Sequence, residues 1–193
     1  MDQFEYVMVL ISIIVGLGIA HLLWGIGGII DRLASRPGSL KLGVGYFAWF
    51  AQIFLWMALF WWWEFRFGEL ITDWTVGVYF FLVSYAIALF LLSAVIVPRT
   101  WDEVADLNEY FLQRRRWFYV ILLMAVTLDV ADSYLKGGMD RIVAPSLAFW
   151  VACLFASVVG LRATTIRPHT IAGLIVLTIN IAITVVDLPR LGF

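Results

Sequence analysis

Two aspartates interrupt an apolar segment that runs from Trp117 to Tyr134, and they are the residues best suited to chemistry. Asp129 and Asp132 are three positions apart, so in a helix they share one face, with Lys136 one turn further. An ionisable group at membrane depth is costly and marks a candidate functional site. Either carboxylate could carry a proton or bind a cation. The structural alternative is that Asp132 pairs with Lys136 and Asp129 hydrogen-bonds a neighbouring helix.

Three further polar side chains lie inside other apolar segments. Gln52 and Asn180 fall near the middle of theirs, and His21 lies in the first segment. A histidine titrates near neutral pH, which suits a proton relay. Together with Asp129 and Asp132, these are the predicted ion-handling residues. Hydrogen bonding between helices would explain each of them without an ion.

Residue patterns that would indicate other kinds of site are missing from the sequence. Cys153 is the single cysteine, and no paired Cys and His spacing suggests a zinc site. His169 is predicted to lie in a loop, so His21 alone cannot supply two axial ligands to a haem. A net charge of -1 offers no basic surface to a nucleic acid. We therefore expect no metal, no cofactor, no nucleic-acid partner and no enzymatic activity.

The composition shows where these polar residues must reside. The chain has 193 residues, of which 63% are hydrophobic and 14% charged. An ordinary soluble domain is about 45–50% apolar and about 25% charged. The excess is concentrated in blocks of roughly 20 residues, the length at which a helix crosses a bilayer. The sequence thus predicts an integral membrane protein with the lipid bilayer as its surroundings.

Six such blocks predict an all-α, polytopic bundle of six transmembrane helices forming a single integral membrane domain over 1–193. Their lack of strict alternation argues against a barrel. The expected spans are about 4–30, 44–63, 75–97, 117–134, 142–161 and 170–186. The polar segment 101–112 has apolar residues at helical spacing, which predicts a short amphipathic helix at the cytoplasmic interface.

Basic residues predict the orientation of the spans. Nine of the 13 Lys and Arg residues lie in the segments 31–43, 98–116 and 162–169. Because basic loops stay in the cytoplasm, both termini are predicted to lie outside it. Most acidic residues then fall on the outer side, where they would attract cations.

Small residues at four-residue spacing predict places where helices pack closely. They form two series, Ser12, Gly16 and Ala20 in the first span and Ala144, Ala148, Ala152, Ala156 and Gly160 in the fifth. Either series could pack inside one bundle. The other interpretation is a subunit contact in a homo-oligomer.

The segments 4–23, 115–119 and 128–132 resemble a family of small bacterial membrane proteins that carries no assigned activity. The resemblance implies a six-helix protein of the bacterial inner membrane. From the acids and the outer charge bias we predict an oligomeric channel or transporter for a cation or proton. The alternative is a non-catalytic partner or sensor subunit whose buried polar groups only hold helices together.

Overall fold

The computed structural model describes residues 3–64, 74–138 and 144–187, and there the chain forms six long α-helices. Each helix is long and apolar enough to cross a membrane. The helices are α1 (Gln3–Ser35), α2 (Val44–Glu64), α4 (Val76–Ile96), α5 (Leu107–Gly137), α6 (Ala144–Arg162) and α7 (Ile166–Asp187). The predicted all-α six-helix bundle is confirmed, and the chain has the architecture of a polytopic membrane protein.

Local sequence signals set several helix ends. The Asp106 carboxylate accepts hydrogen bonds from the backbone N–H groups of Asn108 (2.8 Å) and Glu109 (3.3 Å), which caps the start of α5. Thr75 caps α4 in the same way. Gly138, with φ of 61°, follows the end of α5 in a conformation that favours glycine.

The predicted interfacial helix over 101–112 is not a separate element. Residues 101–106 form turns, and from Leu107 the chain continues as α5 without a break into the fourth span. No proline or glycine interrupts it before Gly137. At 1.5 Å per residue, its 31 residues extend about 46 Å, well beyond the roughly 30 Å of a hydrocarbon core. Of the polar residues in the predicted segment, Asn108 and Glu109 lie in the first turn of α5, and Asp102, Glu103 and Asp106 precede the helix.

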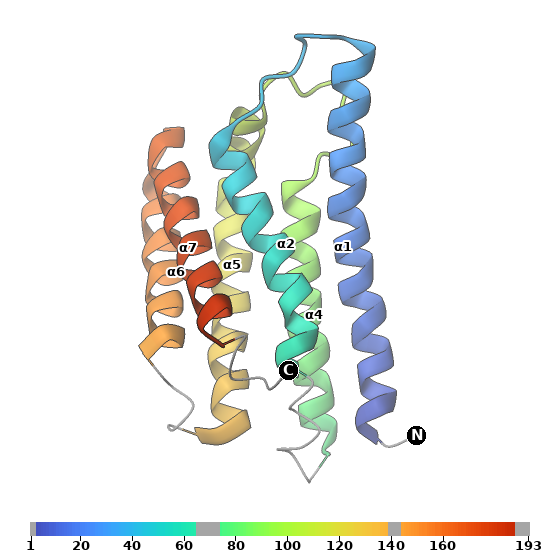
Figure 1. Cartoon of the computed structure of the whole chain (residues 1–193), viewed down its shortest axis with the longest axis vertical. Helices are drawn as coiled ribbons and strands as arrows, with labels where there is room; N and C mark the ends of the chain where they lie inside the picture. Colours follow the sequence, from blue (N-terminus) through green and yellow to red (C-terminus); the bar gives the residue numbers. More distant parts are fainter. Residues whose placement is uncertain (1–2, 65–73, 139–143, 188–193) are drawn as a thin grey trace.

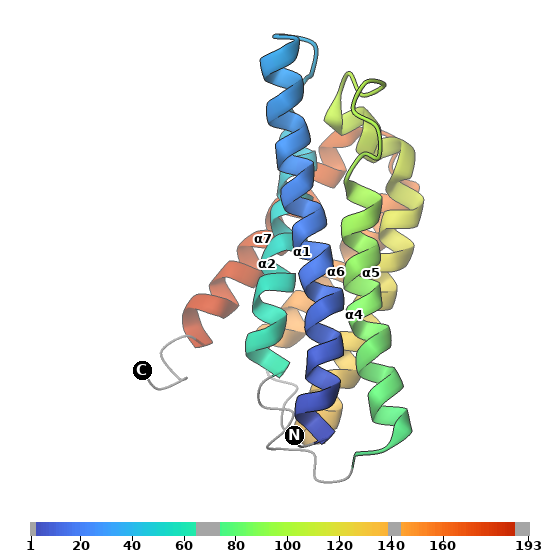
Figure 2. The ribbon, with the colours of Figure 1, turned by 90° about the vertical axis from the view of Figure 1, so that its right-hand side faces the viewer.

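Most of the helices lie roughly along the long axis of the molecule (Figure 1). The upper end of the bundle in this view carries the loops 36–43 and 97–106, and the lower end carries the start of α1 and the end of α7. α2 contacts α7, α1, α4 and α5, whereas α1 packs mainly on α4 rather than on α2. Figure 2 shows α7 tilted against the other helices. The buried face of α2 therefore forms much of the interior.

Backbone pairing at the upper end fixes α2 relative to α5. The Lys41 N–H donates to the Ala105 carbonyl (2.8 Å), and the Leu107 N–H donates to the Lys41 carbonyl (3.1 Å). The Tyr46 N–H donates to Asn108 Oδ1 (3.1 Å). These bonds join the two loops and hold the starts of α2 and α5 together.

The two series of small residues take different positions in the bundle. Gly16 and Ala20 of α1 are exposed, and nothing lies within 4 Å of a Cβ added at Gly16. Ser12 is half-buried. In α6, Ala148 is exposed and Ala152 half-buried, while Ala156 and Gly160 are buried. Close approach by α1 uses other glycines instead, namely Gly18, Gly25 and Gly28.

Replacing Gly160 with leucine should destabilise the bundle. A Cβ at this position would run into the Tyr119 ring of α5, so the extra side chain forces the two helices apart, at a cost of about 1–3 kcal/mol. The measurement is unfolding in detergent micelles. Gly16→Leu is the matched control and should change stability by less than about 0.5 kcal/mol. Equal losses of stability in both variants would contradict the close contact between Gly160 and Tyr119. Loss of oligomer mass in Gly16→Leu alone would place the exposed face of α1 in a subunit contact.

Candidate functional site

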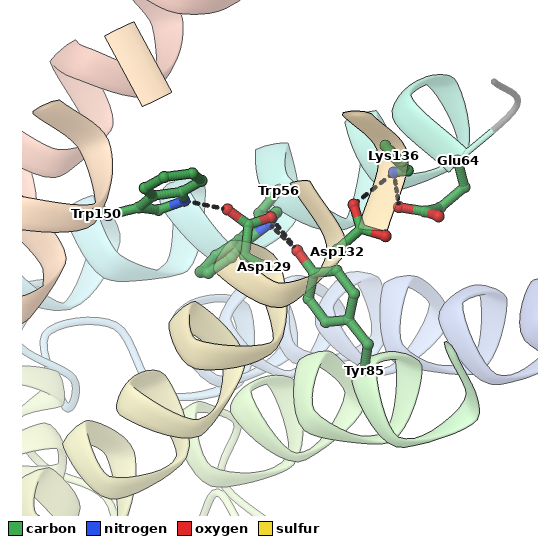
Figure 3. Close-up of polar contacts among 7 residues, drawn as sticks. All are labelled: Trp56, Glu64, Tyr85, Asp129, Asp132, Lys136 and Trp150. Carbon is green, nitrogen blue, oxygen red and sulfur yellow. Dashed lines mark hydrogen bonds and ion pairs between the residues drawn. The ribbon is translucent and has the colours of Figure 1, made fainter. Parts of the chain in front are cut away.

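Asp129 of α5 joins three helices directly through its carboxylate and a fourth through Tyr85 (Figure 3). Tyr85 of α4 donates its hydroxyl to Oδ1, and Trp150 of α6 donates its indole N–H to Oδ2 (2.6 Å). Trp56 of α2 donates in turn to the Tyr85 hydroxyl (3.1 Å). Both oxygens of this carboxylate therefore have a donor, which is the geometry of the structural alternative.

A second group of charges lies toward the lower end of the bundle. The Lys136 ammonium contacts Glu64 Oε1 of α2 (2.8 Å) and Asp132 Oδ2 of its own helix (2.5 Å) (Figure 3). The side chains of Glu64, Asp132 and Lys136 are only 2%, 6% and 10% exposed. We call these three residues the acid–lysine cluster.

The acid–lysine cluster contains more acid than base. Two carboxyl groups face one ammonium, and Glu64 Oε2 and Asp132 Oδ1 are buried with no hydrogen-bond partner among the described residues. Buried polar atoms in proteins are nearly always bonded. Each of these oxygens can accept a proton or contact a small cation. The cluster is thus the part of the described structure best suited to binding one.

Gln52 and Asn180 are buried but are not hydrogen-bonded to the acids. Both amide atoms of Gln52, and Nδ2 of Asn180, have no hydrogen-bond partner in the described part of the chain. Gln52 lies on the buried face of α2 between Trp49 and Trp56. It therefore places an unpaired amide in the buried part of α2.

Among the described residues, no contact joins His21 to the other predicted ion-handling residues. It is half-exposed on α1, and its ring centroid lies 6.0 Å from that of Trp24 on the same helix. The reason is the packing of α1, which lies mainly on α4 rather than on the helices that carry the acids.

His169 lies within α7, so its assignment to a loop was wrong, because α7 begins at Ile166, before Pro168. Its ring is buried and stacks on Tyr119 of α5 with centroids 5.6 Å apart. The Tyr119 hydroxyl is 2.9 Å from Nδ1, and Nε2 is 3.3 Å from the Ala163 carbonyl. Trp49 of α2 donates to the His169 backbone carbonyl (3.0 Å). We call His169 and Tyr119 the histidine–tyrosine pair.

Glu64 and His169 were not among the predicted site residues. Glu64 reads as the polar residue that ends the second span, but it follows Trp56 and Phe60 at four-residue spacing, and all three are buried. That four-residue spacing was the signal that could have placed Glu64 on the buried side of the helix. Nothing in the sequence places His169 beside Tyr119, because the two are 50 positions apart on helices that meet only in the folded chain.

Within the described residues, no group of three His, Cys, Asp or Glu side chains is placed to hold a metal ion. The chain matches no family model, no curated protein and no solved structure.

Proposed function

We propose that this membrane protein transports a proton or another small monovalent cation, and that the acid–lysine cluster is its ion-binding site. The observation that carries the proposal is the second carboxyl group beside Lys136. Among the described residues of the cluster, one ammonium balances one carboxylate, and the second carboxyl group is buried. A charge in this position is expensive unless it is neutralised. Binding a proton or cation neutralises it, and releasing that ion restores it.

Asp129 supports a second candidate, in which the polar interior only fixes the helices of a partner or sensor subunit. Both its oxygens are occupied by donors from Tyr85 and Trp150, as expected for a brace. The two candidates differ in what they predict for Asp132, where an oxygen has no partner among the described residues.

An Asp132→Asn variant separates the two candidates. It removes one negative charge and leaves Glu64 and Lys136 as a balanced pair, so the fold should persist. Parent and variant are reconstituted into liposomes that contain pH-sensitive or sodium-sensitive dyes, and ion entry is driven by an inside-negative potential. We expect ion flux in the parent and its loss in Asp132→Asn. Asp102→Asn is the control, because this carboxylate is 86% exposed and should not affect flux.

The thermal unfolding midpoint of each variant is measured in the same lipid. A folded Asp132→Asn protein with parental flux would contradict the proposed binding site. A parent whose flux equals that of empty liposomes would favour the structural candidate.

A further inference from the structure

We propose that the upper end of the bundle binds anionic phospholipid headgroups through four arginines on α5, α6 and α7. These residues, which we call the arginine patch, are Arg115, Arg116, Arg162 and Arg167. Lipid binding at this surface is separate from ion transport and does not depend on it. Three features carry the proposal, namely the distance of the patch from acidic residues, its level in the membrane and the apolar side chains beside it.

Contacts just below the patch bring the upper ends of these three helices together. In the histidine–tyrosine pair, a ring of α5 stacks on a ring of α7. A Cβ added at Gly160 of α6 would meet the Tyr119 ring. The four arginines lie two to four positions from these residues on their own helices, toward the upper end in Figure 1. At 1.5 Å per residue, that places them about 3–6 Å above the contacts.

The upper end of the bundle is basic, and the arginine patch accounts for its excess charge. Nine basic and five acidic residues of this end lie in the segments 31–43, 97–116 and 162–167. All five acids and five of the bases lie at the end of α1, in the two loops and at the start of α5. Positive and negative charges are equal in number there. The other four bases are the patch.

The patch arginines lie in parts of the chain that contain no acid. The sequence has no Asp or Glu in 110–128 or in 144–186. Elsewhere at the upper end, Asp102 pairs with Arg32 (3.3 Å) and Arg36 (3.7 Å). Within the described residues, by contrast, no carboxylate forms an ion pair with the patch. An anionic partner from outside the chain therefore meets positive charge that the protein does not balance.

The length of α6 places the patch at the edge of the hydrocarbon. α6 has 19 residues, which extend about 28 Å at 1.5 Å per residue, close to the roughly 30 Å of a hydrocarbon core. Arg162 is its last residue, so it lies where the lipid headgroups begin. Trp117, next to Arg116, is 70% exposed, and tryptophan favours this level of a membrane. The patch thus lies at the level of lipid phosphates.

Each exposed arginine of the patch lies one turn above an exposed apolar side chain of the same helix. The pairs, at four-residue spacing, are Arg116 with Val120, Arg162 with Val158, and Arg167 with Ile171. Residues four apart share a helix face, so charged and apolar surface are continuous. A lipid with an anionic headgroup and apolar tails complements both parts. A nucleic acid or an acidic peptide complements only the arginines.

The experiment measures the lipid preference of the full chain in detergent micelles, through quenching of tryptophan fluorescence by brominated lipids. Anionic phosphatidylglycerol is compared with zwitterionic phosphatidylcholine that carries the same tails. Each basic residue near an anionic surface strengthens binding roughly fivefold, so we expect the parent to prefer phosphatidylglycerol by at least about tenfold. The triple glutamine variant Arg116→Gln, Arg162→Gln and Arg167→Gln should lower this preference roughly tenfold.

A second triple variant is the matched control, namely Arg36→Gln, Lys41→Gln and Arg99→Gln. It removes the same charge from three exposed residues at the same end of the bundle, where acids balance the bases. It should keep the parental preference to within about twofold. Replacing the three exposed patch arginines with lysine keeps their charge and should keep the preference as well.

The unfolding midpoint of each variant shows whether it is folded. Parental preference in the folded triple glutamine variant would overturn the proposal, and so would its loss in the control or in the lysine variant. Inorganic phosphate is tested at matched ionic strength, and phosphate that raises the parental midpoint through the same three arginines would assign the patch to free phosphate instead. If the triple glutamine variant does not fold, its three single variants decide, with an expected loss of roughly fivefold each.

Discussion

A Lys136→Met variant is expected to lose about 3–5 kcal/mol of stability, because it leaves two buried carboxyl groups without their shared ammonium. Methionine keeps most of the side-chain volume, so packing changes little. Unfolding in detergent micelles at neutral pH measures the loss. The control is Arg36→Met, which removes an ion pair between two side chains that are 64% and 86% exposed and should cost less than about 1 kcal/mol.

Neutralising the acids should rescue this variant. The triple variant Glu64→Gln, Asp132→Asn and Lys136→Met contains no charge in the cluster, and replacing a complete buried ion cluster is often neutral or stabilising. We expect it to recover most of the loss seen with Lys136→Met. A triple variant as unstable as the single one would show that the cost lies in packing or other contacts rather than in unbalanced charge.

Replacing Asp129 is expected to lower stability by an amount similar to that for Lys136. Asp129→Leu leaves the Tyr85 hydroxyl and the Trp150 indole N–H without their acceptor, and each unpaired buried donor costs about 1–3 kcal/mol. Asp129→Asn keeps one acceptor oxygen, so its loss should be about half as large. Unfolding of both variants in the same micelles gives the comparison.

Thr127→Val is the matched control for Asp129. The Thr127 hydroxyl is exposed on the same helix and bonds only to the Leu123 carbonyl among the described residues. The variant should therefore lose no more than about 0.5 kcal/mol of stability. Tyr85→Phe combined with Asp129→Leu should cost less than the sum of the single variants, since they remove the same bond. Additive losses would contradict the bond between these two residues.

The sequence predicts the six long apolar helices because one property, a run of about 20 apolar residues, marks each of them. It also predicts the pairing of Asp132 with Lys136, offered as an alternative, because four-residue spacing within one helix is local information. The extent of α5 was harder to predict. The apolar composition begins near Trp117. The helix itself begins ten residues earlier, at Leu107, because the Asp106 side chain caps its first turn.

The candidate site could be predicted only in part, because its bonds join helices that are distant in the sequence. Asp129 lies at membrane depth in the sequence, but its donors come from Tyr85 and Trp150 on two other helices. Glu64 reaches Lys136 across 72 positions. Such contacts depend on which helices are neighbours. No short stretch of the sequence indicates that α1 packs mainly on α4 rather than on α2.

Proton entry into liposomes that contain either the parent protein or the triple variant of the acid–lysine cluster tests the central claim most directly. The triple variant removes all three charges without leaving one unpaired, so its fold can be verified independently by its unfolding midpoint. We expect parent liposomes to acidify under an inside-negative potential, and liposomes with the folded triple variant to acidify only at the rate of empty liposomes. Equal rates in the parent and the folded triple variant would contradict it.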